Sequence, residues 1–380
     1  MTVIMIRTIR GKLLRPALLT GVLALVLFGG IAMAQTVKQL PPPPPVPRLK
    51  PTPTPKPPET EVLDVVRVTS NLVMVPVSVV DQQGQAVQGL RIEDFRLEEE
   101  GKTQQVTELL DPEQVPLDIA LLFDISSSTS QKGFFQSQQN AAAAFLRLVM
   151  KPADKAAVFG ISTDPLMLQP LSSTQAASTR ILAIPPADKP VATAFYDTVK
   201  AAAKYLAENS PGRNRKVIIV LSDGDDTNSA RIRDLWIAEA RANPNVEMNR
   251  AGMKTAFQSG HRAAVQEVQQ EVQRSDVIFY SVNPGGPSIY LNQIAMRAQS
   301  GMKSIADATG GSAFVPDSDK DLDKVFRQVA AELRGQYILG YYGNSEAPAG
   351  QFRRIQVITP GRTDVKIRAR QGYYVKKGDK

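Results

Sequence analysis

The chain has 380 residues, of which 45 are basic and 37 acidic, so its net charge is +8. Four of the basic residues lie in the first 34, and the remainder has no basic run interleaved with aromatic residues, which argues against nucleic-acid binding. The absence of cysteine excludes disulfides, thiolate metal sites and cysteine nucleophiles, and the single histidine excludes a histidine-rich metal cluster. An apolar content of 43% is typical of a globular protein, and the length allows one large core and a smaller second unit.

Residues 1–34 have the pattern of a secretory signal peptide. Met1–Arg15 is basic, Pro16–Ile31 is apolar but shorter than the roughly 20 residues of a membrane span, and Ala32-Met33-Ala34 is a small-residue cleavage sequence. We therefore expect cleavage after Ala34 and a secreted or periplasmic protein. An uncleaved membrane anchor is the alternative.

Residues 35–61 are predicted to be a proline-rich linker. The stretch Pro41–Pro58 holds eleven of the 28 prolines, and such a run favours an extended polyproline II spacer over a packed fold. The spacer would hold the folded part away from the membrane or cell wall.

The two ends of the remaining chain are rich in strand-like sequence. Residues 62–112 contain VVRV, then LVMVPVSVV over Leu72–Val80, a DQQG turn and two short runs; residues 336–376 contain YILGYY, RRIQVIT and VKIRARQGYYV (Val365–Val375). Neither end is large enough to fold alone as a β-sandwich. We expect them to meet in one accessory β-domain.

Between these ends, over residues 113–335, strand-like and helix-like segments alternate. The strands are predicted at 117–123, 156–162, 217–221, 277–282 and 312–316. Helices are predicted at 134–149 and 196–207, in a long segment over 231–275, before Gly310 and at 322–333. Strands that are apolar on both faces and alternate with helices indicate an α/β fold with a doubly wound, mainly parallel, Rossmann-like sheet. In such sheets, ligands lie at the carboxyl ends of the strands.

Oxygen-bearing side chains occur where two of these strands end. Asp124, Ser126 and Ser128 follow the first strand, Asp223 follows VIIVL, and Thr193 lies in a loop before the helix at 196. Carboxylates and hydroxyls are ligands for hard divalent cations rather than zinc or copper. The residues therefore predict a cation site, with magnesium expected first and calcium or manganese as alternatives.

These residues resemble the metal-ion-dependent adhesion site of von Willebrand factor type A (VWFA) domains. Other parts of the chain resemble a secreted bacterial VWFA-related subgroup, namely the stretches NLVMVPVSVVDQQG, EDFRLEEEGK, ADATGGSAF and DLDKVFRQVAAELRGQYILGYY. The similarity covers roughly Val62–Val375. It implies that Ser126, Ser128 and Thr193 contact the cation, and that Asp124 and Asp223 complete the shell directly or through water. The sequence departs from the family pattern at Ser127 and in segment 231–274, which is longer than usual. We expect this segment to form a helical projection beside the site.

The resemblance implies a non-enzymatic binding protein whose cation holds an acidic group of an unidentified partner protein. One alternative is a structural envelope protein in which the metal only stabilises the fold. A metal-dependent hydrolase is a weaker alternative, because Ser126 stands where an aspartyl phosphatase would carry its second carboxylate, and no G-x-S-x-G motif is present.

Several other polar or aromatic residues receive structural interpretations. We expect His261 to pack on the apolar face of a helix, and Trp236 to lie in the core or between paired helices. Asp225, Asp226 and Asn228 are interpreted as turn residues. Asp197 either orients the Thr193 loop or simply stabilises the first turn of its helix.

Overall fold

A computed structural model describes residues 72–126, 135–189, 191–242, 250–287, 292–343 and 347–376. All of them belong to one compact unit, Val66–Lys380. The predicted signal peptide, the proline-rich linker, the VVRV stretch and Ser128 lie outside the described residues. In the part that is described, no helix is both long and apolar enough to cross a membrane.

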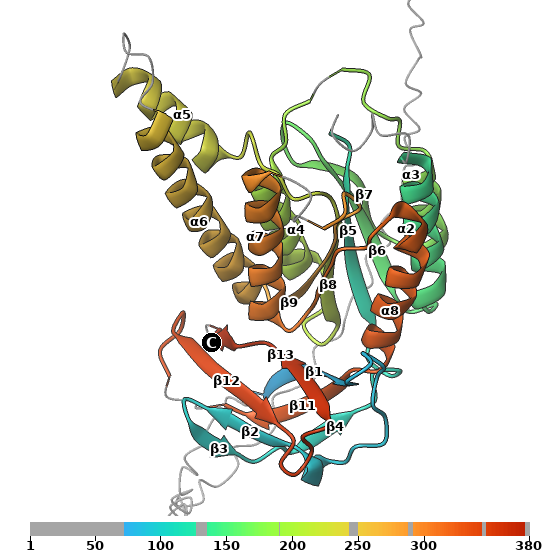
Figure 1. Ribbon diagram of the computed structural model, residues 1–380. Helices are drawn as coiled ribbons and strands as arrows, with labels where there is room; N and C mark the ends of the chain where they lie inside the picture. Colours follow the sequence, from blue (N-terminus) through green and yellow to red (C-terminus); the bar gives the residue numbers. More distant parts are fainter. Residues whose placement is uncertain are drawn as a thin grey trace, which may run out of the picture. The chain divides into compact units, whose positions relative to one another are not determined.

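The centre of the unit is a six-stranded sheet in the order β10-β9-β8-β5-β6-β7 (Figure 1). Five strands run parallel, and only the edge strand β7 is antiparallel, to β6. This confirms the predicted doubly wound, mainly parallel fold. The strands are β5 (Leu117–Asp124), β6 (Lys155–Ile161), β7 (Leu166–Ser172), β8 (Arg215–Leu221), β9 (Val277–Val282) and β10 (Ala313–Phe314).

Strand β5 shows why these sequences form central strands. Successive side chains of a strand point to opposite faces, and β5 is apolar at both sets of positions. Ile119, Leu121 and Phe123 pack in one hydrophobic cluster, whereas Ala120 and Leu122 pack in the other. A strand that is buried on both faces needs helices on both sides of the sheet.

Helices cover the two faces as the alternating pattern predicts (Figure 1). The cluster on one face includes residues of α2 (Phe135–Val149), α3 (Thr174–Leu182) and α8 (Leu322–Arg334). The opposite cluster includes residues of α4 (Phe195–Asn209), α5 (Ala230–Ala242), α6 (Arg250–Arg274) and α7 (Gln293–Thr309). The predicted long helical segment is therefore the helix pair α5 and α6, which contact each other.

Two elements of this domain were not predicted from the sequence, namely β7 and α3. The strand β7 carries Pro170 and has no buried residue, so its sequence lacks a clear apolar alternation. Proline is tolerated there because β7 is an edge strand. Pairing with β6 decides that this segment is extended, and the pairing cannot be read from the segment itself.

The remaining strands form two four-stranded sheets in the orders β13-β1-β11-β4 and β14-β12-β2-β3. Each sheet combines strands from both ends of the chain, which confirms the predicted accessory β structure; the exact domain boundaries stay predictions. The strands are β1 (Leu72–Asp81), β2 (Arg96–Glu99), β3 (Lys102–Gln104), β4 (Glu108–Leu110), β11 (Tyr337–Tyr342), β12 (Phe352–Ile358), β13 (Val365–Ala369) and β14 (Gly372–Tyr374).

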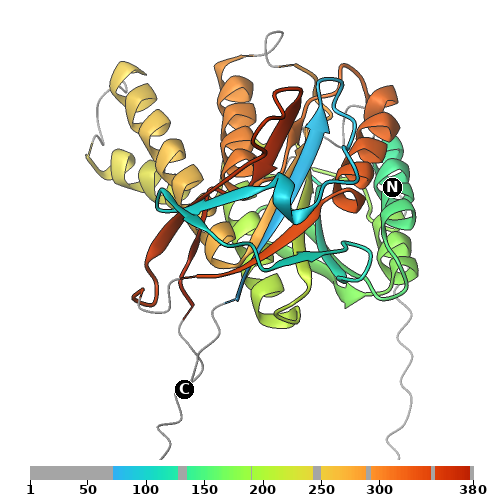
Figure 2. The same cartoon turned by 90° about the horizontal axis from the view of Figure 1, so that it is seen from below.

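Strand β1 is the centre of this accessory structure. It pairs with β11 on one side and β13 on the other, so the start of the described chain lies between two C-terminal strands (Figure 2). Its alternate residues Val73, Val75, Val77 and Val79 share a hydrophobic cluster with residues of the second sheet. The strand-like stretch over 365–375 is confirmed as β structure, but it forms two strands rather than one. The chain leaves β13 at Ala369 and re-enters as β14 in the other sheet.

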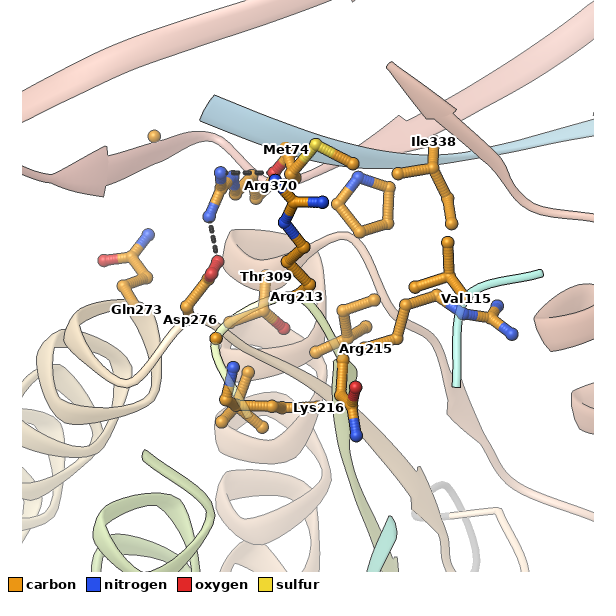
Figure 3. Close-up of a pocket in the computed structure, with 16 residues that line it drawn as sticks. Met74, Val115, Arg213, Arg215, Lys216, Gln273, Asp276, Thr309, Ile338 and Arg370 are labelled. Atoms are coloured by element: carbon orange, nitrogen blue, oxygen red, sulfur yellow. Dashed lines mark hydrogen bonds and ion pairs between the residues drawn. The ribbon is translucent and has the colours of Figure 1, made fainter. Parts of the chain in front are cut away.

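Arg370, between β13 and β14, links the accessory sheets to the central domain (Figure 3). Its guanidinium donates to the carboxylate of Asp276, which lies between α6 and β9, and to the main-chain carbonyl of Met74 in β1. Nearby, Arg215 of β8 donates to the carbonyl oxygens of Leu333 (2.6 Å) and Pro112 (3.1 Å). Together with Lys216, these side chains line a cavity of about 40 Å³.

Replacing Asp276 by Asn is expected to destabilise the protein only where the carboxylate is charged. Burial alone would raise the pKa of Asp276, but Arg370, Lys376 and Lys216 lower it below its ordinary value. Ionised Asp276 therefore stabilises the folded state above pH ~4, and this contribution is lost as the pH falls through the folded-state pKa. Urea unfolding should show D276N about 1–3 kcal/mol less stable at pH 7, with the difference shrinking below about pH 4.

The matched control is Asp364→Asn. Asp364 also pairs with an arginine, Arg362, but both side chains are exposed, so the substitution should leave the unfolding free energy unchanged. A stability difference for D276N that stays constant from pH 7 to pH 3 would contradict the role given to its charge.

Candidate functional site

Asp124 is the last residue of β5 and is only 1% exposed. Its carboxylate accepts hydrogen bonds from the main-chain N–H of Ser126 (2.8 Å) and from the hydroxyl of Ser222 (2.5 Å). Burial, with a further contribution from the nearby Asp223 carboxylate, raises the pKa of Asp124 to about 6, although the hydrogen bonds from Ser126 and Ser222 oppose the shift. Two carboxylates that disfavour each other's charge in a buried place create a local demand for positive charge.

Asp223 follows β8, the strand that pairs with β5, and the pairing brings it to the same edge of the sheet. The register aligns Phe123 with Leu221, so the polar residues that follow both strands emerge side by side. The half-buried Asp223 carboxylate accepts the main-chain N–H of Asp225 at 3.3 Å. The two aspartates predicted from the strand ends are therefore neighbours.

Thr193 lies just before α4 and is buried. Its main-chain N–H donates to the Thr227 hydroxyl (2.9 Å), and its carbonyl accepts from the main-chain N–H groups of Thr227 and Asn228 (both 2.9 Å). The loop that carries Thr193 is thus fastened to the loop that follows Asp223. Within the described ranges, the Thr193 hydroxyl itself has no hydrogen-bond partner.

Ser126 is buried and lies two residues beyond Asp124. Its main-chain N–H donates a hydrogen bond to the Asp124 carboxylate. The position of Ser128 is outside the described residues, so its predicted part in the site stays a prediction. Four of the five predicted ligands thus lie at the carboxyl end of the parallel sheet, Asp124 as the last residue of β5 and Ser126, Thr193 and Asp223 on loops.

The predicted metal ligands carry few charged groups. Among the described residues there is no group of three or more His, Cys, Asp or Glu side chains placed to hold a metal ion. The predicted set has two carboxylates, and its other members carry hydroxyls. Such a set fits a hard divalent cation that keeps an open position for an outside ligand.

Two residues that organise the site were missed by the sequence interpretation. Ser222 donates to Asp124 and accepts the main-chain N–H of Gly224 (2.9 Å), which fixes the turn that presents Asp223. Gly224 has φ of 76°, a conformation that favours glycine. The available signal was only a hydroxyl residue at the end of an apolar strand, which does not reveal its partner.

Asp226 is the second missed residue, because it is far more than a turn residue. It is 3% exposed, and its carboxylate accepts the main-chain N–H groups of Tyr196 (2.8 Å), Asn228 (3.2 Å) and Ser229 (2.9 Å). Asp226 therefore ties the first turn of α4 to the approach to α5. Burial raises the pKa of Asp226, although these hydrogen bonds oppose the rise.

Asp197 contributes a reciprocal tie between the same two helices. Its carboxylate accepts the main-chain N–H of Ala230 at the start of α5 (2.7 Å) and pairs with Lys200 (2.8 Å), while its own N–H donates to the Ser229 hydroxyl (3.0 Å). Asp197 lies in the first turn of α4, as one interpretation predicted, and it also caps α5; among the described residues, the partners of its carboxylate do not include the Thr193 loop.

His261 is buried, as expected, with Nδ1 at 3.1 Å from the Tyr196 hydroxyl. Burial, helped by Arg297, lowers the pKa of His261 to about 4. Of the two interpretations of Trp236, the structure confirms packing between paired helices rather than a position in the core. Trp236 packs edge-on against Phe257 between α5 and α6, but 44% of its surface is exposed.

Comparison with known proteins finds a family match for the central segment of the chain. Residues 119–225 match the family of the von Willebrand factor type A domain, which confirms the resemblance for that segment. No curated protein matches the chain.

Solved structures similar to this chain include three proteins at low identity. An aerotolerance-related membrane protein from Bacteroides fragilis is 14% identical, with a TM-score of 0.39, and the match covers 57% of this chain and 98% of that one. Proximal thread matrix protein 1 from the mussel byssus, with a zinc-occupied MIDAS motif, is 15% identical (TM-score 0.41; 63% and 50%). The PilB minor pilin from Streptococcus sanguinis is 15% identical (TM-score 0.43; 58% and 62%). The chain thus spans about half the length of the byssus protein.

Replacing Asp226 by Ala is expected to destabilise the protein by at least about 2 kcal/mol, because it leaves buried main-chain donors of α4 and the α5 approach without an acceptor. Chemical unfolding measures the change. Asp234→Ala, an exposed aspartate on α5, is the control and should change stability by less than about 0.5 kcal/mol. Equal stabilities of the two variants would show that Asp226 does not hold these loops together.

Proposed function

Because residues 119–225 match the family of the von Willebrand factor type A domain, we propose that this protein binds a divalent cation and uses it to hold an acidic group of a partner protein. The ligands are Asp124, Ser126, Ser128, Thr193 and Asp223. The observation that carries the proposal is the convergence of three loops at one sheet edge, through the Ser222–Asp124 hydrogen bond and the three hydrogen bonds between the Thr193 and Thr227 segments.

The chemistry of the ligands supports magnesium as the cation. Hydroxyl groups bring no charge, and the two carboxylates can at most balance the two positive charges of the ion. A cation held in this way stays attractive to an additional carboxylate, which is the group a partner protein can supply. Calcium and manganese have the same preference for oxygen and remain alternatives.

Binding is favoured over catalysis by what surrounds the site. The chain's single histidine is buried between Tyr196 and Phe257, and its lowered pKa follows from that burial. It is therefore not placed as a general base for an attacking water. The proposed role of the cation is to bridge two proteins.

Thr193→Val tests the cation site without disturbing the fold. The substitution removes only the hydroxyl, which makes no hydrogen bond among the described residues, so the melting temperature should not change. Calorimetric titration with magnesium should show affinity reduced at least about tenfold in T193V and abolished in Asp124→Ala. Thr163→Val, an exposed threonine outside the predicted ligand set, should bind magnesium like the wild type.

Capture of a partner protein then tests whether the cation takes part in recognition or has only a structural role. A pull-down from envelope extract should recover a partner with magnesium, but not with EDTA or with T193V. If T193V binds magnesium more weakly as expected and still captures the same partner as well as wild type, the metal does not bridge the two proteins. Failure of the wild-type chain to bind any divalent cation would overturn the proposal itself.

We also propose that the protein acts outside the cytoplasm, which rests on the signal-peptide pattern of residues 1–34. Cleavage after Ala34 would leave a chain that begins at Gln35. The intact mass of the protein isolated from its native cells should correspond to residues 35–380, and a mass that includes the first 34 residues would contradict export with cleavage.

A further inference from the structure

A groove of about 1000 Å³ lies beside the candidate cation site. We call it the helical groove: it is lined by Trp236 of α5, Phe257 and Arg262 of α6, Ile294 and Arg297 of α7, and the segment 225–227. The α5–α6 pair in Figure 1 provides one wall and α7 the other. The volume is at the upper limit of small-molecule pockets, and it suits several side chains of a polypeptide.

One wall of the helical groove is aromatic and exposed. Trp236, the only tryptophan of the chain, is 44% exposed, and its ring centroid lies 4.3 Å from that of Phe257. On the opposite wall, Ile294 is also 44% exposed. Large apolar side chains that face each other across an open groove are typical of a surface that a partner covers.

The groove is lined by charges of both signs, Asp225 and Asp226 against Arg262 and Arg297. In the described part of the chain, Arg262 is exposed and has no ion-pair partner. Arg297 lies 3.5 Å from Asp225, a distance that leaves it weakly paired. The other acidic residue of the lining, Asp226, is occupied by its own main-chain donors. Arg262 is therefore the basic group of the lining that can pair with a carboxylate of a bound segment.

The helical groove continues directly into the cation site. Thr227 lines the groove and accepts the main-chain N–H of Thr193, while Asp225 lines the groove and donates its N–H to the carboxylate of Asp223. The same short segment thus borders both features. A chain whose carboxylate reached the cation would have its neighbouring residues over the groove.

We propose that the helical groove binds the part of the partner that flanks the cation-bridging carboxylate, so that the partner presents an acidic segment with an aromatic or large aliphatic side chain. That apolar side chain packs against Trp236 and Phe257, and a second carboxylate pairs with Arg262. This inference rests on the proposed function, since the cation supplies the first anchor and the groove supplies the specificity.

Selection from a random 12-residue peptide display library tests the inference on the full chain. Peptides retained in magnesium and released by EDTA should each carry a carboxylate together with an aromatic or large aliphatic residue. A synthetic copy of one such peptide should bind Trp236→Ala at least about tenfold more weakly than wild type, while the magnesium affinity of W236A is unchanged. Arg262→Glu, which replaces an exposed and unpaired side chain, should weaken the peptide similarly.

Matched variants distinguish a loss of contacts in the helical groove from a general disturbance of the fold. Ile237→Ala removes an equally exposed apolar residue (42%) next to Trp236 that does not line the groove, and it should bind the peptide like wild type. Trp236→Phe should retain most of the affinity, because an aromatic surface remains.

The possible failures are distinguishable. Magnesium-dependent peptides that are acidic but not enriched in apolar residues, or equal peptide binding by wild type, W236A and R262E, would overturn the groove inference and leave the proposed function intact. Apolar peptides that bind equally in EDTA would show that groove and cation do not share one partner. The absence of any magnesium-dependent peptide would overturn both proposals.

Discussion

The parallel pairing of β5 with β8 is the constraint on which the site depends. Both strands are buried over their whole length, and their register runs from Leu117 opposite Arg215 to Phe123 opposite Leu221. Because polar side chains in the middle of these strands would lie in the core without partners, the polar residues gather where the strands end. Asp124 and the Ser222–Asp223 pair therefore emerge together. The desolvation of Asp124 is offset in part by hydrogen bonds from Ser126 and Ser222, and a bound cation would offset it further.

The loops around this sheet edge are held by hydrogen bonds exchanged between the N-termini of two helices. Asp226 accepts from the first turn of α4, and Asp197 accepts from the start of α5. Each carboxylate satisfies main-chain donors of the other helix and lies near the positive end of its dipole. This arrangement fixes the Thr193 loop against the loop after Asp223, and it also positions the helix pair that forms one wall of the helical groove. Cation site and groove thus share one supporting framework.

The accessory sheets give the two chain ends a common structural role. Strand β1 lies between β11 and β13, so neither end can form its sheet without the other. Arg370 then connects these sheets to the central domain through Asp276 and the Met74 carbonyl. Gly310, which ends α7 with φ of 83°, also belongs to this junction, because a side chain there would meet the backbone of Ala369 at 2.7 Å. The central domain and accessory sheets are thereby closely packed against each other.

The sequence alone determined the strand and helix alternation, the shared β structure of the two ends, and the placement of Asp124 and Asp223 at strand ends, because apolar periodicity and chain order are local properties. It also indicated Thr193, through resemblance to a family motif. Only the tertiary structure decided which residues hold these predicted ligands in place. Ser222 and Asp226 act through partners 98 and 30 positions away in the chain, and Trp236 is exposed because α5 and α6 pair beside the sheet instead of extending as one buried helix. The edge strand β7 and the break between β13 and β14 were decided in the same way, since pairing between distant segments sets them and no single stretch of sequence records it.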